Sequence, residues 1–432
     1  MLPESSAKVL VIGGGGREHA LCWKLAQSNR VEKILCAPGN GGTQTCPKVT
    51  NVDAAVSDFE KLAGICRDEK IDLVVVGPDN PLADGVVDFL QERGVRVFGP
   101  TKSGARIEWS KSYAKQFMQD HGIPTARYCV ADNLSDGLKL AEENSWANVV
   151  KVDGLALGKG VFVCDSVLEV KQALGTIFEM RAFGDAGATV LLEERLSGEE
   201  MSLLFFCDGK RLVRMPASQD HKRRFDGDRG PNTGGMGVFA PVELYDRCAL
   251  DIEELVVEPF ERALARGALN YCGIVYAGMM VTPQGDPFVL EFNARFGDPE
   301  TQALLPLLAS DLFEILWACT EGTLDSVEVK WEDKASCCVV AAAKDYPEKS
   351  SKGESIVLGT MPKDSFVFHA GTKLDGTKLL TNGGRVLAVT AVAPDLGMAR
   401  KQAYESIERI QFSDMDYRKD IAGGAAEKCL SS

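Results

Sequence analysis

VLEFNARFGDPE, residues 289–300, is the stretch that decides the fold, together with VVKVDGLALGKGV at 149–161 and LLEERLSGEE at 191–200. Each stretch begins with an apolar run typical of a buried strand and continues into charged or glycine-rich residues. Strand periodicity places Glu291 and Asn293 on one face with Val289, so Phe288, Leu290 and Phe292 are expected to face the core. The pattern predicts strands that present polar groups to a shared site.

Glu291 and Asn293 are candidate metal ligands. They supply a carboxylate and an amide oxygen, hard donors of the kind that Mg²⁺ uses when it bridges nucleotide phosphates and keeps several waters. A strand end with solvated polar side chains would look the same. The residue types alone leave both interpretations open.

The segment GLALGKG, residues 154–160, superficially resembles a Walker A loop. Only three residues separate its first two glycines, Gly160 stands where Ser or Thr is required, and a strand rather than a helix follows. A P-loop holds phosphates at a helix N-terminus, so this segment must work differently. We expect a hairpin lid whose amides and Lys159 fold over a triphosphate.

A second glycine cluster, GGGGREH at 13–19, lies between an apolar strand and an amphipathic helix. It fits the dinucleotide fingerprint poorly, because Glu18 occupies the third glycine position and the next strand ends in Ala37-Pro38-Gly39 without a ribose-binding acid. A tight turn that needs no ligand is one alternative. Four glycines followed by Arg17 favour an anion held by backbone N–H groups.

The order of elements predicts a multidomain protein with α/β and α+β parts. Strands at 8–12, 33–37, 71–76 and 94–98 alternate with helices at 57–69 and 82–93, which is typical of a doubly wound parallel sheet with helices on both faces. Ser110 is a candidate N-cap for a helix that ends at His121, before Gly122. These signals place a first domain at 1–108.

Beyond residue 108 the pattern changes. Hairpin-forming strands predict a lid lobe, at about 126–196, inserted in a central domain at 109–328. That domain also contains a helix at 247–267 and strands at 274–281 and 287–293. A strand-rich domain at 329–432 follows, with a helix at 396–410.

Composition excludes several classes of function. The net charge is −14, which disfavours nucleic acid and anionic membranes as partners. The 13 cysteines show no CxxC or zinc spacing, so we expect free thiols, with Cys337 and Cys338 in the core. No basic leader or long apolar run is present, which predicts a cytoplasmic protein.

The three stretches, in this order, resemble the ATP-grasp superfamily. GGGGREH, QDHKRRFDGDRGPNTGGMG at 219–237 and FNARFGDPE at 292–300 together resemble the phosphoribosylamine-glycine ligase family, and the likeness extends to HAGT at 369–372 and GGRVLAVTA at 383–391. The resemblance implies an ATP-grasp core and the ATP-dependent joining of glycine to 5-phosphoribosylamine in purine synthesis. The products would be glycinamide ribonucleotide, ADP and phosphate, formed through glycyl phosphate.

The resemblance also implies ligands and roles. ATP would be a co-substrate with Mg²⁺ or Mn²⁺ at Glu291 and Asn293, and other purine-synthesis domains or enzymes would be partners. Many superfamily members place a further metal carboxylate where this chain has Tyr276 to Met280, so the second metal ion lacks that ligand here. The implied nucleotide-binding residues are Lys111 and Lys151 on the phosphates, Lys159 in the lid, Glu193, Glu194, Arg195 and Leu196 at the adenine hinge, Glu200 on the ribose, and Arg223 and Asn232.

On the acceptor side, the implied ribose-phosphate site combines three strand ends. Asp220 would hold the glycine ammonium, and Lys222, Arg295 and Asp298 would approach substrate; Arg295, Lys151 and Asp220 are the implied catalytic residues. A solvated charge remains the alternative for the loop residues, and an ion pair with Asp298 or Glu300 for Arg295. The implied ribose-phosphate residues are Gly15, Gly16, Arg17, Asn40, Pro78 and Asp79.

Three rival functions remain. The first is another ATP-grasp carboxylate-amine ligase of purine synthesis, one that activates formate or bicarbonate. The second is a dinucleotide-dependent oxidoreductase built on the N-terminal sheet. The third is a nucleotide-binding regulator without catalysis, which the full set of metal and lysine positions disfavours.

Overall fold

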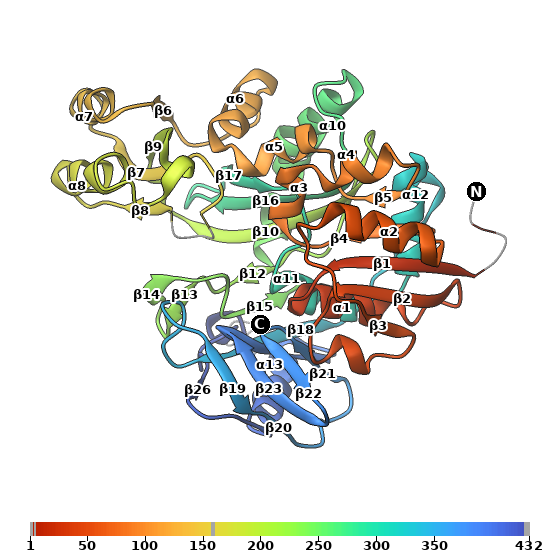
Figure 1. The fold of residues 1–432 in the computed structure, drawn as a ribbon. Coiled ribbons are helices and arrows are strands. Elements are labelled where there is room, and N and C mark those ends of the chain that lie inside the picture. The colour runs from red at the N-terminus through yellow and green to blue at the C-terminus, as the bar shows by residue number, and fades with distance from the viewer. Residues whose placement is uncertain (1–2, 4–5, 157–159, 427–432) are drawn as a thin grey trace.

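The computed structural model describes residues 3, 6–156 and 160–426 (Figure 1). Its N-terminal unit is a parallel sheet in the order β3-β2-β1-β4-β5. Helices α1 (Gly16–Leu25) and α2 (Phe59–Glu69) follow β1 and β3 in the chain, and the doubly wound sheet expected from the sequence is confirmed. The strands are β1 (Ala7–Gly13), β2 (Val31–Pro38), β3 (Val49–Asn51), β4 (Leu73–Val76) and β5 (Val97–Phe98).

Two local predictions for this unit were incomplete. Strand β3 was missed, because three residues carry too little periodicity to be recognised. The helix expected at 82–93 is two helices, α3 (Asp79–Asp84) and α4 (Val86–Gln91), separated by Gly85 at φ 96°. Glycine adopts this left-handed conformation at no steric cost, so the chain changes direction there.

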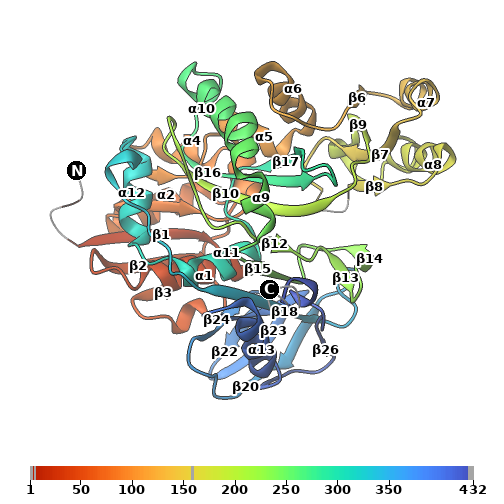
Figure 2. The same cartoon turned by 180° about the vertical axis from the view of Figure 1, so that it is seen from behind.

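The central unit has two sheets. One has the order β11-β10-β16-β17, with β10 (Glu199–Cys207), β11 (Leu212–Arg214), β16 (Gly273–Val281) and β17 (Pro287–Asn293). The other, β6-β9-β7-β8, forms a lobe that projects to one side in both views, with α7 (Leu134–Glu143) and α8 (Val167–Phe178) packed on it (Figures 1 and 2). Its strands are β6 (Tyr128–Ala131), β7 (Ala147–Val152), β8 (Val161–Val163) and β9 (Val190–Glu194).

Helix α6 (Lys111–His121) forms as its sequence signals indicated. The Ser110 hydroxyl accepts a hydrogen bond from the Tyr113 N–H, and Gly122 ends the helix at φ 72°. Such capping satisfies backbone groups that a helix end leaves free. The helix expected at 247–267 is instead interrupted, because α9 (Leu244–Ile252) and α10 (Glu258–Ala265) are joined by a π-helical turn at Glu253–Val257.

Strand β17 departs from simple alternation. Glu291 pairs with Gly278 and Val289 with Met279, so Leu290 is an extra residue in the ladder. Val289 and Phe292 are buried, whereas Phe288 and Leu290 are only partly covered. The prediction that Phe288 and Leu290 face the core and Val289 does not was therefore wrong, because a bulge re-aims the side chains of the strand.

The C-terminal unit contains a sheet in the order β12-β15-β18-β24-β21. Strands β12 (Gln219–Asp220) and β15 (Gly237–Ala240) come from the central part of the sequence, yet pair into this sheet through β18 (Ala335–Ala343). The loop between β12 and β15 is thus anchored at both ends on the C-terminal unit. The remaining strands are β24 (Arg385–Ala393), β21 (Ser365–His369) and β26 (Met415–Asp416), which pairs with the end of β18. Helix α13 (Leu396–Ile407) covers the sheet.

The apolar core confirms one prediction from composition, because Cys337 and Cys338 on β18 are fully buried. Across residues 6–156 and 160–426, none of the helices has both the length and the apolarity needed to span a membrane.

Candidate active site between the central strands and the C-terminal unit

Two buried lysines share one carboxylate at the root of the lobe. Lys151 on β7 and Lys115 on α6 each place Nζ 2.9 Å from Oε2 of Glu193 on β9. Oε1 of Glu193 is buried and has no hydrogen-bond partner among the described residues. Two cations and one anion leave excess positive charge, which suits a polyphosphate.

Lys115 was not recognised from the sequence. It lies four residues after Lys111, one helical turn away on the same face of α6, and this spacing was the available signal. Its Nζ also donates to Thr125 Oγ1 at 2.8 Å. Burial lowers the pKa of Lys115, and the Glu193 carboxylate opposes that effect.

The predicted adenine hinge, residues 193–196, begins with the last two residues of β9. The Glu194 carboxylate accepts two hydrogen bonds of 2.8 Å from Arg127, which lower its pKa, and Arg195 pairs with Asp165 at 2.8 Å. Leu196 is partly buried, and Glu200 pairs with Lys222 at 3.2 Å. The side chains of Glu194 and Arg195 are thus engaged with other protein groups, and adenine binding by the hinge backbone stays a prediction. Lys159 lies outside the described residues.

The candidate metal ligands lie in a strongly cationic environment. Burial alone would raise the pKa of Glu291, but nearby ammonium groups, chiefly those of Lys222 and Lys111, lower it. Glu291 and Asn293 offer two oxygen donors, which fits a hard divalent ion. Elsewhere in the described ranges, no cluster of three or more His, Cys, Asp or Glu side chains could hold a metal on its own. The donor set fits an ion whose remaining ligands come from phosphates and water.

Arg295 is held by a residue that sequence reasoning missed. Its Nη2 lies 3.0 Å from Glu108 Oε1 and donates to Asn293 Oδ1 at 3.1 Å. Glu108 also accepts a 2.7 Å hydrogen bond from the Ala294 N–H. The ion pair of Arg295 is therefore with Glu108, which lies 187 positions earlier in the sequence and carried no local signal, and this pair fixes the guanidinium beside the metal ligands.

The predicted ammonium-binding residue, Asp220, lies at the end of β12. Its Oδ1 is buried without a hydrogen-bond partner among the described residues. Burial and the charge of Glu300 raise the pKa of Asp220, while Lys222 opposes them. Glu300 itself accepts a 2.6 Å hydrogen bond from the Tyr276 hydroxyl. An unsatisfied buried carboxylate is costly, so this position is suited to a cationic ligand.

The loop beyond Asp220 is a short hairpin of β13 (Arg223–Phe225) and β14 (Arg229–Asn232), in which Arg223 pairs with Asn232. The Arg223 side chain donates to the Gly230 carbonyl at 2.8 Å. The base of the hairpin is tied to the C-terminal unit, because the Gly234 N–H donates to the Tyr346 hydroxyl at 3.0 Å.

A cavity of about 420 Å³ lies where the N-terminal and C-terminal units meet. Three expected substrate residues, Gly15, Asn40 and Asp298, line it, and Arg17 is not among its lining residues. Arg385 lies against Asp298 Oδ1 at 3.3 Å and donates to the carbonyls of Asp298, Gly234 and Gly235. The cavity is lined by Gly14, Gly15, Pro38, Gly39, Asn40, Asp298, Tyr346, Ala370, Gly371, Thr372, Asn382 and Arg385.

The C-terminal lining residues were not predicted individually. Ala370, Gly371 and Thr372 belong to the HAGT stretch and Arg385 to GGRVLAVTA, both of which carried part of the family resemblance. That resemblance was the available signal. Composition and periodicity could not place these residues opposite Gly15.

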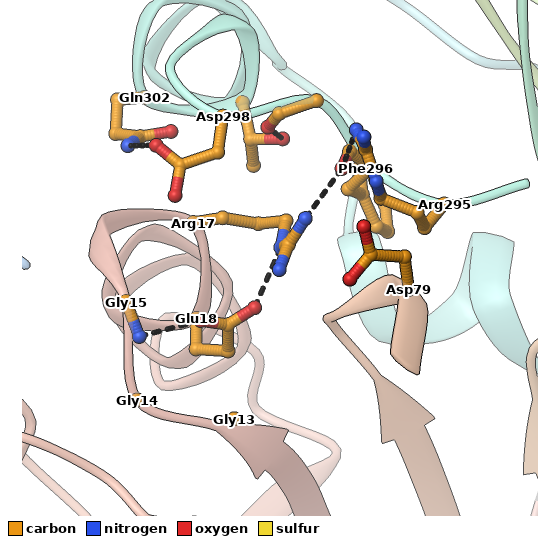
Figure 3. A network of polar contacts seen from close by, with 12 residues as sticks. Gly13, Gly14, Gly15, Arg17, Glu18, Asp79, Arg295, Phe296, Asp298 and Gln302 are labelled. Carbon is orange, nitrogen blue, oxygen red and sulfur yellow. Dashed lines mark hydrogen bonds and ion pairs between the residues drawn. The ribbon is translucent and has the colours of Figure 1, made fainter. Parts of the chain in front are cut away.

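The Glu18 side chain fills the space enclosed by the glycine turn at 13–19 (Figure 3). The Gly15 N–H donates to Glu18 Oε2 at 2.6 Å, and Arg17 pairs with Glu18 Oε1 at 2.6 Å while donating to the Phe296 carbonyl at 3.0 Å. A Cβ at Gly13 or Gly77 would collide with the Glu18 side chain. These glycines make room for an internal acid, which leaves no place for a dinucleotide pyrophosphate.

The other predicted strand-end residues lie nearby. Gly16 opens α1, and a Cβ there would meet the Gln302 amide. Asp79 begins α3 directly after Pro78 and lies close to Arg295 in Figure 3. Asp298 accepts a 2.7 Å hydrogen bond from Gln302 Nε2.

Family models match almost the whole described chain in the order of these units. The N domain of phosphoribosylglycinamide synthetase matches residues 7–108, its ATP-grasp (A) domain 109–301 and its C domain 336–424. The chain belongs to the phosphoribosylglycinamide synthetase family. It is therefore an ATP-grasp ligase, for which ATP and a divalent metal ion are the expected ligands.

Relatives of known name agree with this synthetase family. The phosphoribosylamine-glycine ligase of Caldanaerobacter subterraneus is 46% identical over 96% of this chain and all of its own length. The trifunctional purine biosynthetic protein adenosine-3 of Gallus gallus is 48% identical, and the match spans 42% of that protein.

Solved structures show the same fold. Phosphoribosylamine-glycine ligase from Thermotoga maritima superposes with a TM-score of 0.82 at 36% identity, covering 96% of this chain and 100% of that one. Biotin carboxylase from Campylobacter jejuni, at 16% identity and a TM-score of 0.72, covers 95% and 92%, and shares the fold alone.

Proposed function

We propose that this chain joins glycine to 5-phosphoribosylamine with ATP, through glycyl phosphate, giving glycinamide ribonucleotide, ADP and phosphate. The observation that carries the proposal is the charge pattern around Glu291. Lys111, Lys151, Lys222 and Arg295 all act on this one carboxylate, which suits a metal-bound triphosphate. The unpartnered Oδ1 of Asp220 belongs to the same electrostatic cluster, because Asp220 also acts on Lys222.

Mg²⁺ at Glu291 and Asn293 would neutralise phosphate oxygens and favour attack at the γ-phosphate. The protein's own contribution is to position and neutralise the reactants. Lys151 and Lys111 hold phosphate oxygens, and Arg295, fixed by Glu108, holds the glycine carboxylate in line with the γ-phosphate. No side-chain nucleophile is required.

We assign the cavity between Gly15 and Arg385 to the ribose phosphate. Gly14, Gly39, Thr372, Asn382 and Arg385 are among its lining residues, and Arg385 supplies a cation with which a phosphate would pair. In this proposal the amine of phosphoribosylamine lies on the side of Asp298, toward the segment that carries Arg295. The amine can then attack the acyl carbon while water is kept out.

We further propose that the enzyme works in the cytoplasm and acts beside other purine-synthesis activities. The twelve cysteines within the described residues are all free, which suits a reducing compartment. The chicken relative is named as trifunctional, so a partner activity on the same or another chain is consistent with the family.

The test is ADP release by the purified chain with ATP and Mg²⁺, with glycine and freshly generated phosphoribosylamine added singly and together. We expect full turnover only when both are present. ADP release that ignores glycine would refute the proposal, and formate- or bicarbonate-dependent release would favour the related ligases instead.

A further inference from the structure

Asp153 joins the lobe to helix α6 beside two of the proposed phosphate-binding lysines. It follows β7 directly, and its own N–H donates to the Thr189 carbonyl at 3.0 Å, which fixes it within the lobe. Its Oδ1 accepts a 2.6 Å hydrogen bond from the Ser112 N–H, and its Oδ2 accepts one of 3.1 Å from the Ser110 hydroxyl. The Lys111 N–H donates to the Asp153 carbonyl at 3.3 Å. A residue of the lobe therefore holds the Lys111 backbone and both of its neighbours.

The same connection reaches Lys151. Lys151 lies two positions before Asp153, at the end of a strand in which alternate residues face the same side. Further along α6, Lys115 contacts Glu193 at 2.9 Å, and Lys151 contacts the same carboxylate oxygen at 2.9 Å. Helix α6 and the lobe are thus joined at two places about one helical turn apart, and these contacts fix Lys111 relative to Lys151.

Helix α6 does not need Asp153 for its own cap. The Ser110 hydroxyl already accepts a hydrogen bond from the Tyr113 N–H, which is the usual way in which a serine satisfies the first turn of a helix. The Asp153 carboxylate adds a negative charge from another part of the chain, and it takes the Ser112 N–H that a phosphate could otherwise bind. The protein itself therefore occupies the N-terminus of α6, which leaves the phosphates to the lysine side chains.

We infer that Asp153 is a positioning residue that sets Lys111 and Lys151 in register for the nucleotide phosphates. This inference rests on the phosphate-binding roles proposed for the two lysines, and it adds the residue that keeps them together. Asp153 acts through α6 rather than by contact with the nucleotide, because its two carboxylate oxygens are engaged with Ser112 and Ser110. Its removal should therefore weaken the binding of phosphates and leave the binding of adenosine, which has none, unchanged.

The test compares a nucleotide with its nucleoside. We expect Asp153→Ala to raise the dissociation constant of AMP-PNP, a non-hydrolysable ATP analogue, by about 10-fold in the presence of Mg²⁺, the size of one lost charge-assisted hydrogen bond. Isothermal titration calorimetry measures this constant. The inhibition constant of adenosine against ATP should change by less than about twofold, because adenosine carries no phosphate for the two lysines to hold.

A matched control is Asp395→Ala. Asp395 caps α13 in the C-terminal unit, where its Oδ1 accepts a 2.8 Å hydrogen bond from the Met398 N–H. Its loss should destabilise the fold, while the dissociation constant of AMP-PNP stays that of the unaltered enzyme. Asp153→Asn keeps an acceptor for the Ser112 N–H but loses the charge, so it should fold even if Asp153→Ala does not, and it should raise the dissociation constant of AMP-PNP by a smaller factor.

The outcomes separate the two proposals. If the unaltered enzyme releases no ADP in response to glycine, the proposed function fails. If the unaltered enzyme responds to glycine but the Asp153 variants keep its affinity for AMP-PNP, or lose AMP-PNP and adenosine in equal proportion, this inference alone is overturned.

Discussion

The glycine turn at 13–19 and the acceptor site around Asp220 respond differently to the same physical demand, that buried polar groups be satisfied. In the turn, the Gly15 N–H and the Arg17 guanidinium are satisfied by Glu18. In the candidate active site, Oδ1 of Asp220 on the acceptor side and Oε1 of Glu193 on the nucleotide side have no partner among the described residues. In this chain the glycine cluster lies where an internal side chain closely approaches the backbone, whereas the unpaired oxygens of Asp220 and Glu193 lie where we expect a ligand.

The largest expected effect is at the metal ligand. Glu291→Ala should lower turnover by about 1,000-fold, equivalent to about 4 kcal/mol of transition-state stabilisation, because the cations around Glu291 lose the metal site they serve. The thermal unfolding midpoint should change little. The measurement is Mg²⁺-dependent ADP release with both substrates present. Unchanged activity would show that Glu291 does not bind the catalytic metal ion.

Glu18→Gln tests the other side of the comparison. It leaves the buried Arg17 without its anion, so we expect a loss of about 3 kcal/mol in the free energy of unfolding, measured by chemical denaturation at pH 7. The partly exposed pair of Lys33 and Glu69, 2.8 Å apart, supplies the control, since Glu69→Gln should leave the free energy of unfolding nearly unchanged. A stable variant with greatly weakened ATP affinity would contradict a structural role for Glu18.

Acid should destabilise the packing of the turn against the C-terminal unit. His19 Nδ1 accepts a 2.7 Å hydrogen bond from the backbone N–H of His369. Burial and the charge of His369 lower the pKa of His19 to about 3. Burial lowers the pKa of His369 to about 4. Below the ordinary pKa of about 6.5 the unfolded chain binds protons that the folded chain does not. Stability should therefore fall as the pH drops from about 6.5 toward 4, by about 2 kcal/mol per imidazole at pH 5.

The measurement is the free energy of unfolding at pH 7 and pH 5 for the unaltered chain and His19→Gln. Removing one of the two imidazoles should reduce the pH dependence. An equal slope in both proteins would show that His19 titrates normally in the folded state.

The smallest effect is expected at Arg385, which lines the cavity with Gly15 and donates to the carbonyls of Gly234 and Gly235. Arg385→Lys retains the charge but cannot contact three carbonyl groups at once, so kcat/KM for phosphoribosylamine should fall by about tenfold. Arg409→Lys is the control, because the Arg409 side chain is exposed in the same unit and donates to the Thr360 carbonyl at 2.7 Å, away from the cavity. If the two variants had equal kcat/KM values for phosphoribosylamine, Arg385 would have no part in binding this substrate.

Features that depend on residues close together in the sequence could be predicted, whereas features that depend on contacts between distant residues could not. The Ser110 cap and the Gly122 stop were recognised because capping depends on residues three or four apart. The bulge at Leu290 and the two-lysine contact of Glu193 were not, because they depend on a neighbouring strand and on α6. The sequence can show that Glu18 replaces a fingerprint glycine, but only the folded chain shows its carboxylate inside the turn.

The site follows the same rule. Asp220, Glu291 and Arg295 belong to motifs that can be recognised by likeness, whereas Glu108 lies in a stretch without a motif and contacts Arg295 only because folding brings the two together. The role of Glu108 could be proposed only after this distance was known.

Photoaffinity labelling with 8-azido-ATP and Mg²⁺, followed by peptide mapping, tests the central contrast most directly. The account predicts that label falls on peptides within 147–200, at the lobe strands and the hinge, and that excess ATP prevents it. Labelling of the glycine turn and α1, at 13–25, would contradict the account, because it would place the nucleotide in the turn that Glu18 fills.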